Sequence, residues 1–268
     1  KNVTIKMLAT SDVHGYFFPY DFIEHKPIRG SLARVSRYVK DVRKEYGKNM
    51  LLFDNGDILQ GQPTCYYSHF VRKDSINAAA LAVNYMQYDA QTIGNHDVET
   101  GHDVYDKWIS EVNCPMLGAN VVDTATGDTY LKPYAVFERE GVRIAVIGMI
   151  TPAIPYWLHE KLWQGLRFED MVSASRKWVR HVKDVEKADV VVGLFHSGWD
   201  GGITTDKYSE DASMAVAQQV DGFDVIFYGH DNRRARPNVV NHNGYKEVCI
   251  HPGCNATSVA DATLTLTL

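Results

Sequence analysis

The sequence predicts an α/β fold with an added antiparallel part. Short, almost uniformly apolar stretches alternate along the chain with longer segments whose apolar residues recur every three to four positions. This alternation of buried strands with crossover helices is typical of α/β proteins, and one hairpin and one alternating segment supply the antiparallel part. No repeat, low-complexity segment or linker interrupts the pattern. We therefore expect a single domain that spans residues 1–268.

In the first half of the chain, four strands are expected to alternate with three helices. The strands are predicted over 3–12, 50–57, 90–95 and 115–122. The helices are predicted over 31–47, 74–88 and 102–113. The clearest helix is the first, whose apolar residues Leu32, Val35, Val39 and Val42 fall on one face. Gly47 suits the end of that helix.

The second half opens with a hairpin over 134–150, which turns at Glu140 and Gly141. An irregular segment is expected over 151–165. Helices are then predicted over 169–186 and 209–220, and strands over 189–195, 224–229 and 246–250. The final segment, 258–268, alternates apolar and polar residues, as an edge or half-exposed strand should.

Composition limits the classes of function. Of the 268 residues, 45% are hydrophobic and 23% are charged, as in an ordinary soluble globular protein. The net charge of −5 argues against a general binder of DNA or RNA, which needs a basic face, but allows a small charged substrate. No apolar run approaches the roughly 20 residues that span a bilayer.

The four cysteines, Cys65, Cys114, Cys249 and Cys254, show no CxxC spacing. We favour small buried hydrophobic side chains over a cysteine zinc site. A disulfide between Cys249 and Cys254 is the alternative if the protein is exported.

Five of the predicted strands end in residues of the kinds that bind metals. These residues are Asp12, His14, Asp57, Asn95, His96, His196, His230, Asp231 and Asn232. Taken singly, a histidine or aspartate after a strand is more often a loop residue or a helix cap. No structural need places such residues at the same end of five strands, whereas ligands bind at that edge of an open α/β sheet. The side chains are therefore expected to converge.

The motifs at these strand ends, "DVH", "NGD", "GNHD", "HSG" and "GHDN", resemble in this order the calcineurin-like metallophosphoesterase superfamily over residues 12–232. Within it, "CPMLGANV", "GMITPAIPYW" and "HPGCNATSVADATLTL" resemble the branch of 5′-nucleotidases and 2′,3′-cyclic-nucleotide phosphodiesterases, which are usually exported. This resemblance implies a periplasmic or cell-envelope location after signal removal, although the sequence leaves a cytoplasmic one open.

The resemblance also implies a four-layer α/β/β/α sandwich that forms one catalytic domain. In this branch a separate C-terminal domain commonly recognises the nucleotide, and we expect that domain to be absent from residues 1–268. The implied function is metal-dependent hydrolysis of a phosphoester, with nucleotides or 2′,3′-cyclic nucleotides as substrates.

Carried over to this sequence, the resemblance implies two divalent metal ions. The first would be held by Asp12, His14 and Asp57. The second would share Asp57 and add three ligands, which are Asn95, His196 and His230. Such a pair can clamp a phosphate and activate water for in-line attack on phosphorus.

The usual second histidine of the last motif is replaced here by Asn232, which is implied as a ligand through its amide oxygen, with Asp231 as the alternative. An oxygen in place of an imidazole favours Mn²⁺, Mg²⁺, Fe or Ca²⁺ relative to Zn²⁺ at the first site. The same departure leaves open a degraded metal site in a domain that only binds a ligand.

The resemblance implies that His96 is catalytic: it would face the phosphate and stabilise the transition state or protonate the leaving oxygen. Glu99 would orient that imidazole and raise its pKa; the alternative for Glu99 is a carboxylate that stabilises the start of a helix. Asp97 is expected to hold the loop. Asn95 and His96 are expected to contact the substrate.

Arg233 is a further candidate for contact with the substrate, although a solvated loop is the alternative for "DNRRAR". The aromatic residues Tyr156, Trp157 and Trp163 could line a cleft or belong to the core.

The sequence leaves three other functions open. A general phosphodiesterase or sugar-nucleotide hydrolase would share the metal site. A nuclease would need a basic groove, which the charge balance does not suggest. A ligand-binding domain without catalysis is the third. We expect a small-molecule phosphoester as partner, with no nucleic-acid polymer and no membrane span; the sequence does not fix the oligomeric state.

Overall fold

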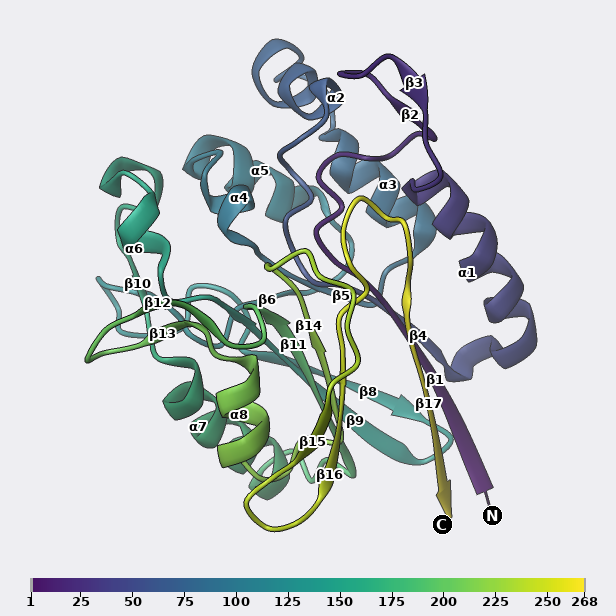
Figure 1. The fold of residues 1–268 in the computed structure, drawn as a ribbon, viewed down its shortest axis with the longest axis vertical. Coiled ribbons are helices and arrows are strands. Elements are labelled where there is room, and N and C mark those ends of the chain that lie inside the picture. The colour runs from purple at the N-terminus through teal and green to yellow at the C-terminus, as the bar shows by residue number, and fades with distance from the viewer. Residues whose placement is uncertain (1, 268) are drawn as a thin grey trace.

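The computed structural model describes residues 2–267, which form two central sheets with helices outside each of them (Figure 1). The predicted α/β/β/α sandwich is confirmed. The first helical layer lies over one sheet and the second over the other, so that the two sheets face each other in the middle of the molecule.

The first sheet has five strands in the order β17-β1-β4-β5-β6. Their bounds are β17 Ala260–Thr267, β1 Asn2–Thr10, β4 Met50–Asp54, β5 Ala90–Thr92 and β6 Met116–Leu117. β1, β4, β5 and β6 are parallel, and β17 pairs antiparallel with β1. The predicted C-terminal edge strand is thus confirmed as far as Thr267, and Leu268 lies outside the described residues.

The second sheet has six strands in the order β15-β16-β14-β11-β9-β8. Their bounds are β15 Asn238–Val240, β16 Lys246–Ile250, β14 Val225–Tyr228, β11 Val190–His196, β9 Val142–Ile150 and β8 Tyr134–Arg139. β8 and β9 form the predicted hairpin, and the two edge strands are the antiparallel ones. The remaining strands are parallel, so their carboxyl ends meet at one edge of the sheet.

The larger helices pack on the outer faces of the sheets. α1 Leu32–Tyr46, α3 Ala78–Met86 and α5 His102–Glu111 cover the first sheet, and α7 Met171–Asp184 and α8 Ser213–Gln219 cover the second. α1 starts where Ser31 accepts a hydrogen bond from the amide of Arg34, and ends at Gly47, whose φ of 55° favours glycine. This helix lies within the predicted range 31–47, whose first and last residues cap it.

The buried apolar residues fall into three clusters, one at each interface of the four layers. β9 shows how one strand serves two interfaces: Val142 and Ile144 face the other sheet, whereas Ala145 and Ile147 face the helical layer. Full burial of such a branched side chain stabilises the fold by about 1.5–3 kcal/mol. This double burial explains why the strands are almost uniformly apolar.

Three sequence predictions about elements are wrong in part. The strand expected over 115–122 is divided: β6 pairs with β5, whereas β7 (Val121–Asp123) pairs with β10 (Leu166–Phe168). Between them, the Asn120 side chain donates hydrogen bonds to the carbonyls of Ile150 and Glu169, which takes the chain out of the sheet.

The helix expected over 209–220 begins later, because Ser209–Asp211 is a strand, β13, that pairs with β12 (Gly201–Thr204). The helix expected over 74–88 likewise begins at Ala78, where Asn77 caps it by accepting from the amide of Ala79.

Shorter elements complete the chain. They are β2 Tyr20–Asp21, β3 Lys26–Pro27, α2 Pro63–Tyr66, a π-helix Tyr67–Val71, α4 Asn95–Val98, α6 Ile154–Trp157 and two 3₁₀ helices, Gly47–Asn49 and Glu160–Leu162. The four cysteines are free, so the alternative disulfide is not formed, and Cys249 is buried. Within residues 2–267, no helix is both long and apolar enough to cross a membrane.

Candidate metal centre

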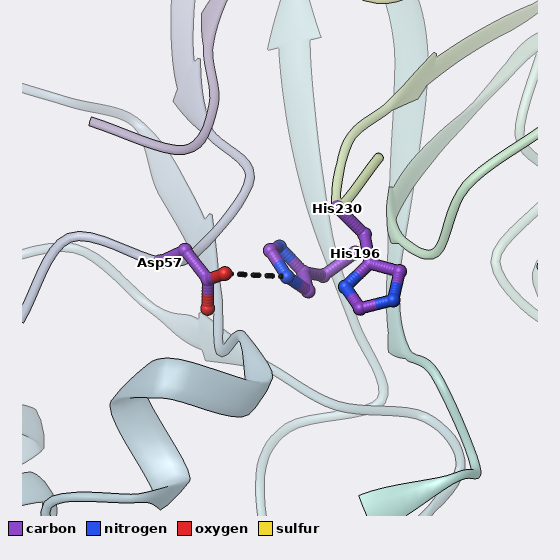
Figure 2. Close-up of side chains that lie close together, drawn as sticks. All are labelled: Asp57, His196 and His230. Carbon is purple, nitrogen blue, oxygen red and sulfur yellow. Dashed lines mark ion pairs between the residues drawn. The ribbon is translucent and has the colours of Figure 1, made fainter. Parts of the chain in front are cut away.

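The residues that the sequence predicts at five strand ends come together at one edge of the sandwich. Asp12, Asp57 and Asn95 follow β1, β4 and β5 of the first sheet. His196 ends β11, and His230 follows β14, in the second sheet. Figure 2 shows Asp57 and His196 pointing toward each other, with the ring of His230 beside His196. The site is therefore built jointly by both sheets.

The backbone is left-handed at several of these positions. Asp12, His14, Asp57, His230 and Asn232 have φ between 49° and 81°. Residues other than glycine rarely adopt this region, which costs about 1–3 kcal/mol each when the surroundings impose it. Such outliers cluster at functional sites, and their gathering here supports a functional centre.

Glycine is needed where two of the loops meet. A Cβ atom on Gly94 would lie 2.1 Å from Oδ1 of Asp57, and one on Gly56 would lie 2.6 Å from the amide nitrogen of Gly94. Both distances are shorter than any tolerable contact. The glycines of "NGD" and "GNHD" thus let the two loops approach closely enough to place Asp57 beside Asn95.

One group of potential ligand atoms comes from Asp12, His14 and Asp57, and these atoms lie within 4.8 Å of one another. Asp12 is fully buried, and both of its oxygens accept from the backbone amide of His230, at 3.2 and 3.1 Å. This contact ties the first group to the loop that carries His230.

A second group lies next to the first and shares Asp57. Nε2 of His196 is 3.1 Å from Oδ2 of Asp57 and 3.0 Å from Oδ1 of Asn95. Nδ1 of His230 is 2.9 Å from the same amide oxygen of Asn95. Asp57 stands between the two groups, as the bridging role that the family resemblance implies for it would require.

The tautomer of His196 is fixed by its other nitrogen. Nδ1 lies 2.7 Å from the carbonyl oxygen of Asn55, so the proton of a neutral ring sits there and Nε2 presents its lone pair to the site. The lone pairs of Nε2 and of the Asn95 and Asp57 oxygens then face one another at about 3 Å. Lone pairs that converge in this way favour a cation between them.

The pKa values of Asp57 and His196 also indicate that the site favours a positive charge. Burial raises the pKa of Asp57, but the charges of His196, His96 and His14 outweigh burial and leave this pKa lowered. Burial lowers the pKa of His196, but the charge of Asp57 outweighs it and raises this pKa. The opposite shifts of these two pKa values indicate that the buried site favours a positive charge beside Asp57. Carboxylate, amide and imidazole ligands together fit a divalent cation.

His96 stands at the rim of this site. Its backbone amide donates to Oδ1 of Asp57 at 2.9 Å, and its ring lies edge-on to that of His14 with centroids 5.6 Å apart. Nδ1 of His96 is 2.7 Å from Oε2 of Glu99. Burial lowers the pKa of His96, yet the charge of Asp57 and the contact with Glu99 raise it overall. The predicted pairing of His96 with Glu99 is present.

Asp97 holds the loop around Asp57, as expected from the sequence. Its fully buried carboxylate accepts from the amides of Asp57 and Gly94, both at 2.8 Å, and from those of Ile58 and Leu59 at 2.9 and 2.8 Å. Burial and the charge of Asp57 raise the pKa of Asp97 to about 6.

The residues that follow His230 make few contacts with the candidate ligands. The side chain of Asn232 is exposed and makes no hydrogen bond to another described residue, so its role as a ligand stays a prediction. Asp231 turns elsewhere: one oxygen lies 3.0 Å from Nε2 of the buried His251, and the other accepts from the amide of Trp199. Arg233 is exposed, and its predicted contact with substrate also stays a prediction.

The aromatic residues expected either to line a cleft or to belong to the core are found in both settings. The ring of Trp157 lies 5.6 Å from that of His230, beside the site, and Tyr156 is exposed. Trp163 packs against the core instead.

Sequence reasoning missed two residues. The fully buried side chain of Asn55 donates to the carbonyl of Phe195 at 2.6 Å, which joins the two sheets beneath the site. Its position next to "GD" in a loop after a buried strand was the available signal. Glu210 lies 2.9 Å from Nε2 of His230, but it comes from the β12–β13 hairpin, which the sequence pattern did not predict.

Comparison with known proteins agrees with this geometry. The family described as calcineurin-like phosphoesterase matches residues 5–234, which include all the candidate ligands. The chain belongs to this family. Members of the family use divalent metals, and the two groups of ligand atoms described above are where this chain can hold them.

Two similar proteins are named as nucleotide phosphoesterases or nucleotidases. The trifunctional nucleotide phosphoesterase protein YfkN of Bacillus subtilis is 30% identical over 86% of this chain and 17% of its own length. The 2′,3′-cyclic-nucleotide 2′-phosphodiesterase/3′-nucleotidase of Haemophilus influenzae is 29% identical over 87% of this chain and 36% of its own length. The chain thus spans less than half the length of either relative.

Solved structures share the fold. A crystal structure of the calcineurin-like phosphoesterase YfkN from Bacillus subtilis superposes with a TM-score of 0.88 at 26% identity and covers 100% of this chain and 86% of its own. A putative 5′-nucleotidase from Staphylococcus aureus superposes with a TM-score of 0.84 at 25% identity, over 98% of this chain and 51% of its own.

Proposed function

We propose that this protein hydrolyses phosphoesters of nucleotides or 2′,3′-cyclic nucleotides at a centre that holds two divalent cations. The observation that carries the proposal is the pair of adjacent ligand groups that share Asp57. One group is completed by Asp12 and His14, and the other by Asn95, His196 and His230. Membership of the phosphoesterase family supports the same function.

The charges of the site favour an anionic substrate. Two divalent cations, when bound, supply Lewis-acid polarisation of phosphate oxygens and lower the pKa of water enough for attack at neutral pH. Asp12 and Asp57 balance two of the four positive charges, and the excess attracts phosphate although the whole protein is acidic.

His96 is the proposed general acid. Its raised pKa keeps a proton available near neutral pH, and its place at the rim, beside both Asp57 and His14, allows contact with the leaving oxygen. Glu99 fixes the ring through Nδ1, so that Nε2 is the atom that would carry the proton to the leaving group.

Nucleotides are proposed as the substrate class because the relatives are named for them. These names are 2′,3′-cyclic-nucleotide 2′-phosphodiesterase/3′-nucleotidase and 5′-nucleotidase. Arg233, which is exposed on the loop that follows His230, is a proposed contact for the rest of the substrate, whereas the exposed Asn232 is proposed as a further metal ligand.

The test is hydrolysis by metal-stripped protein that is refilled separately with Mn²⁺, Mg²⁺, Ca²⁺, Zn²⁺ or Fe²⁺. Bis-p-nitrophenyl phosphate and p-nitrophenyl phosphate distinguish diester from monoester cleavage, and 2′,3′-cyclic AMP, 3′-AMP and 5′-AMP then define the nucleotide. We expect turnover only with added metal, and its loss in His196→Ala.

His242→Ala is the matched control, because His242 is exposed and pairs with Asp221 away from the site. Its activity should equal that of the wild type. Absence of turnover with every metal and every substrate would contradict the proposal and favour a domain that only binds a ligand.

A further inference from the structure

Each of the three histidines of the candidate centre has its second ring nitrogen held by an oxygen outside the site. Nδ1 of His14 lies 3.3 Å from the carbonyl of Gln60, and Nδ1 of His196 lies 2.7 Å from the carbonyl of Asn55. His230 differs from both: its Nε2 is held, by Glu210 at 2.9 Å, and its Nδ1 faces Asn95. Only His230 is held by a charged side chain.

Glu210 is itself fixed at three points. Its Oε2 accepts from the amide of Ile203 at 2.7 Å. Its backbone carbonyl accepts from the hydroxyls of Thr151 at 2.9 Å and Ser197 at 2.7 Å. The carboxylate therefore has a defined position, and only Oε1 is directed at His230.

The backbone around Glu210 is shaped for this contact. A Cβ atom on Gly202 would lie 2.5 Å from the carboxyl carbon of Glu210, and Gly202 has a φ of 65°. Glycine at this position of the β12–β13 hairpin lets the chain pass close to the carboxylate. The side chains of Glu210 and His230 are 14% and 12% exposed, so water competes little for the contact.

We infer that Glu210 is a positioning residue for the metal centre. It accepts the Nε2 proton of His230, and this fixes the tautomer in which Nδ1 presents its lone pair toward Asn95 and Asp57. A carboxylate on the far nitrogen also makes an imidazole a stronger ligand, and loss of such a partner weakens metal affinity about 10- to 100-fold. The inference rests on the proposed metal-binding role of His230.

An ordinary surface ion pair would not account for this arrangement. Exposed ion pairs contribute about 0–1 kcal/mol to stability, and their long side chains are not held in one geometry. Here the contact is mostly buried, its carboxylate is oriented by the hydrogen bond from the amide of Ile203, and the opposite nitrogen points into the cluster of ligand atoms. Trp157, whose ring lies 5.6 Å from that of His230, further restricts rotation of the imidazole.

The experiment is calorimetric titration of metal-stripped protein with Mn²⁺ in the absence of substrate. The proteins compared are the wild type, Glu210→Ala, Glu210→Gln and Asp211→Asn. Asp211 is the matched control, because this neighbouring carboxylate accepts from the amide of Gly198 and stays 3.9 Å from Nε2 of His230. Urea unfolding of the same metal-free proteins reports any loss of fold.

We expect two Mn²⁺ per chain in the wild type and, in Glu210→Ala, binding of one of them weakened by about 10- to 100-fold at unchanged stoichiometry. Glu210→Gln should recover part of this loss, because its amide oxygen still accepts from Nε2. Asp211→Asn should bind like the wild type. If Glu210→Ala does not fold, Glu210→Gln decides: weaker binding supports the inference, and wild-type affinity overturns it.

Wild-type affinity in Glu210→Ala would overturn the inference. A third Mn²⁺ that is lost in Glu210→Ala would also overturn it, because Glu210 would then be a ligand of a site of its own. Since binding is measured without substrate, a wild type that binds two Mn²⁺ but hydrolyses no phosphoester would count against the proposed function alone.

Discussion

Nδ1 of His96 lies 2.7 Å from Oε2 of Glu99, the residue that follows the short helix α4, while the backbone amide of His96 donates to Asp57. The short helix thus connects a carboxylate at the rim with a candidate bridging ligand, and places an imidazole between them. This arrangement separates two roles that lie side by side in the sequence: Asn95 belongs to the ligand cluster, and His96 does not.

His96→Ala should therefore retain metal and lose most of the catalytic rate. Loss of a positioned general acid lowers kcat by about 10²- to 10⁴-fold. The measurements are kcat on a phosphoester and Mn²⁺ affinity on the same preparation. Loss of Mn²⁺ binding in this variant would contradict the assigned role, since His96 would then be a ligand.

Glu99→Gln should shift the pH–rate profile. Glu99 helps to raise the pKa of His96, and a general acid loses activity as pH rises through its pKa. Removal of the Glu99 charge lowers that pKa, so the alkaline limb of kcat should move to lower pH. A profile that keeps its alkaline limb in place, with only the amplitude changed, would contradict the dyad.

Asp97→Ala should destabilise the fold strongly. It removes an acceptor from four buried amides, and each amide left unpaired costs about 1–3 kcal/mol. We expect the free energy of unfolding in urea to fall by about 3 kcal/mol or more, whereas Asp206→Ala, on an exposed loop, should change it by less than about 0.5 kcal/mol. Equal stability of the two variants would contradict the role of Asp97.

Glu247→Gln should stabilise the protein at alkaline pH. Burial, with smaller contributions from the charges of Asp224 and Asp221, raises the pKa of Glu247 to about 7. Its Oε2 is buried and has no hydrogen-bond partner among the described residues. Because the folded protein holds this proton more tightly than the unfolded chain does, stability is lost as pH rises from about 4.5 through 7.

The measurement for Glu247 is urea unfolding at pH 5 and pH 8. Glu247→Gln should exceed the wild type by about 1 kcal/mol at pH 8 and match it at pH 5. Glu45→Gln, at an exposed position of α1, is the control and should show no such dependence on pH. An equal effect of Glu247→Gln at both pH values would contradict the assignment.

Much of the fold follows from sequence pattern, because burial on both faces leaves a clear signal. β9 and β11 are nearly unbroken apolar runs since each packs against a sheet on one side and helices on the other. The hairpin of β12 and β13 has no such signal: its residues are exposed or half-buried, and it is held by Glu210 rather than by apolar packing.

The residues of the candidate site likewise include some that sequence pattern could predict and some that it could not. Asp12, Asp57 and His196 could be predicted because each follows or ends a buried parallel strand, where position in sequence fixes position in space. Glu210 could not, since its contact with His230 depends on the path of an irregular hairpin. Asn232 was implied as a ligand by resemblance, and its exposed side chain leaves that role to experiment.

The most direct test of a metal centre shared through Asp57 is the metal content of the wild type and of Asp57→Ala, measured by elemental analysis after saturation with Mn²⁺ and dialysis. Because Asp57 belongs to both ligand groups, we expect two Mn²⁺ per chain in the wild type and fewer than one in Asp57→Ala, which should remain folded. Two Mn²⁺ retained by Asp57→Ala, or none bound by the wild type, would contradict a shared centre built by the two sheets.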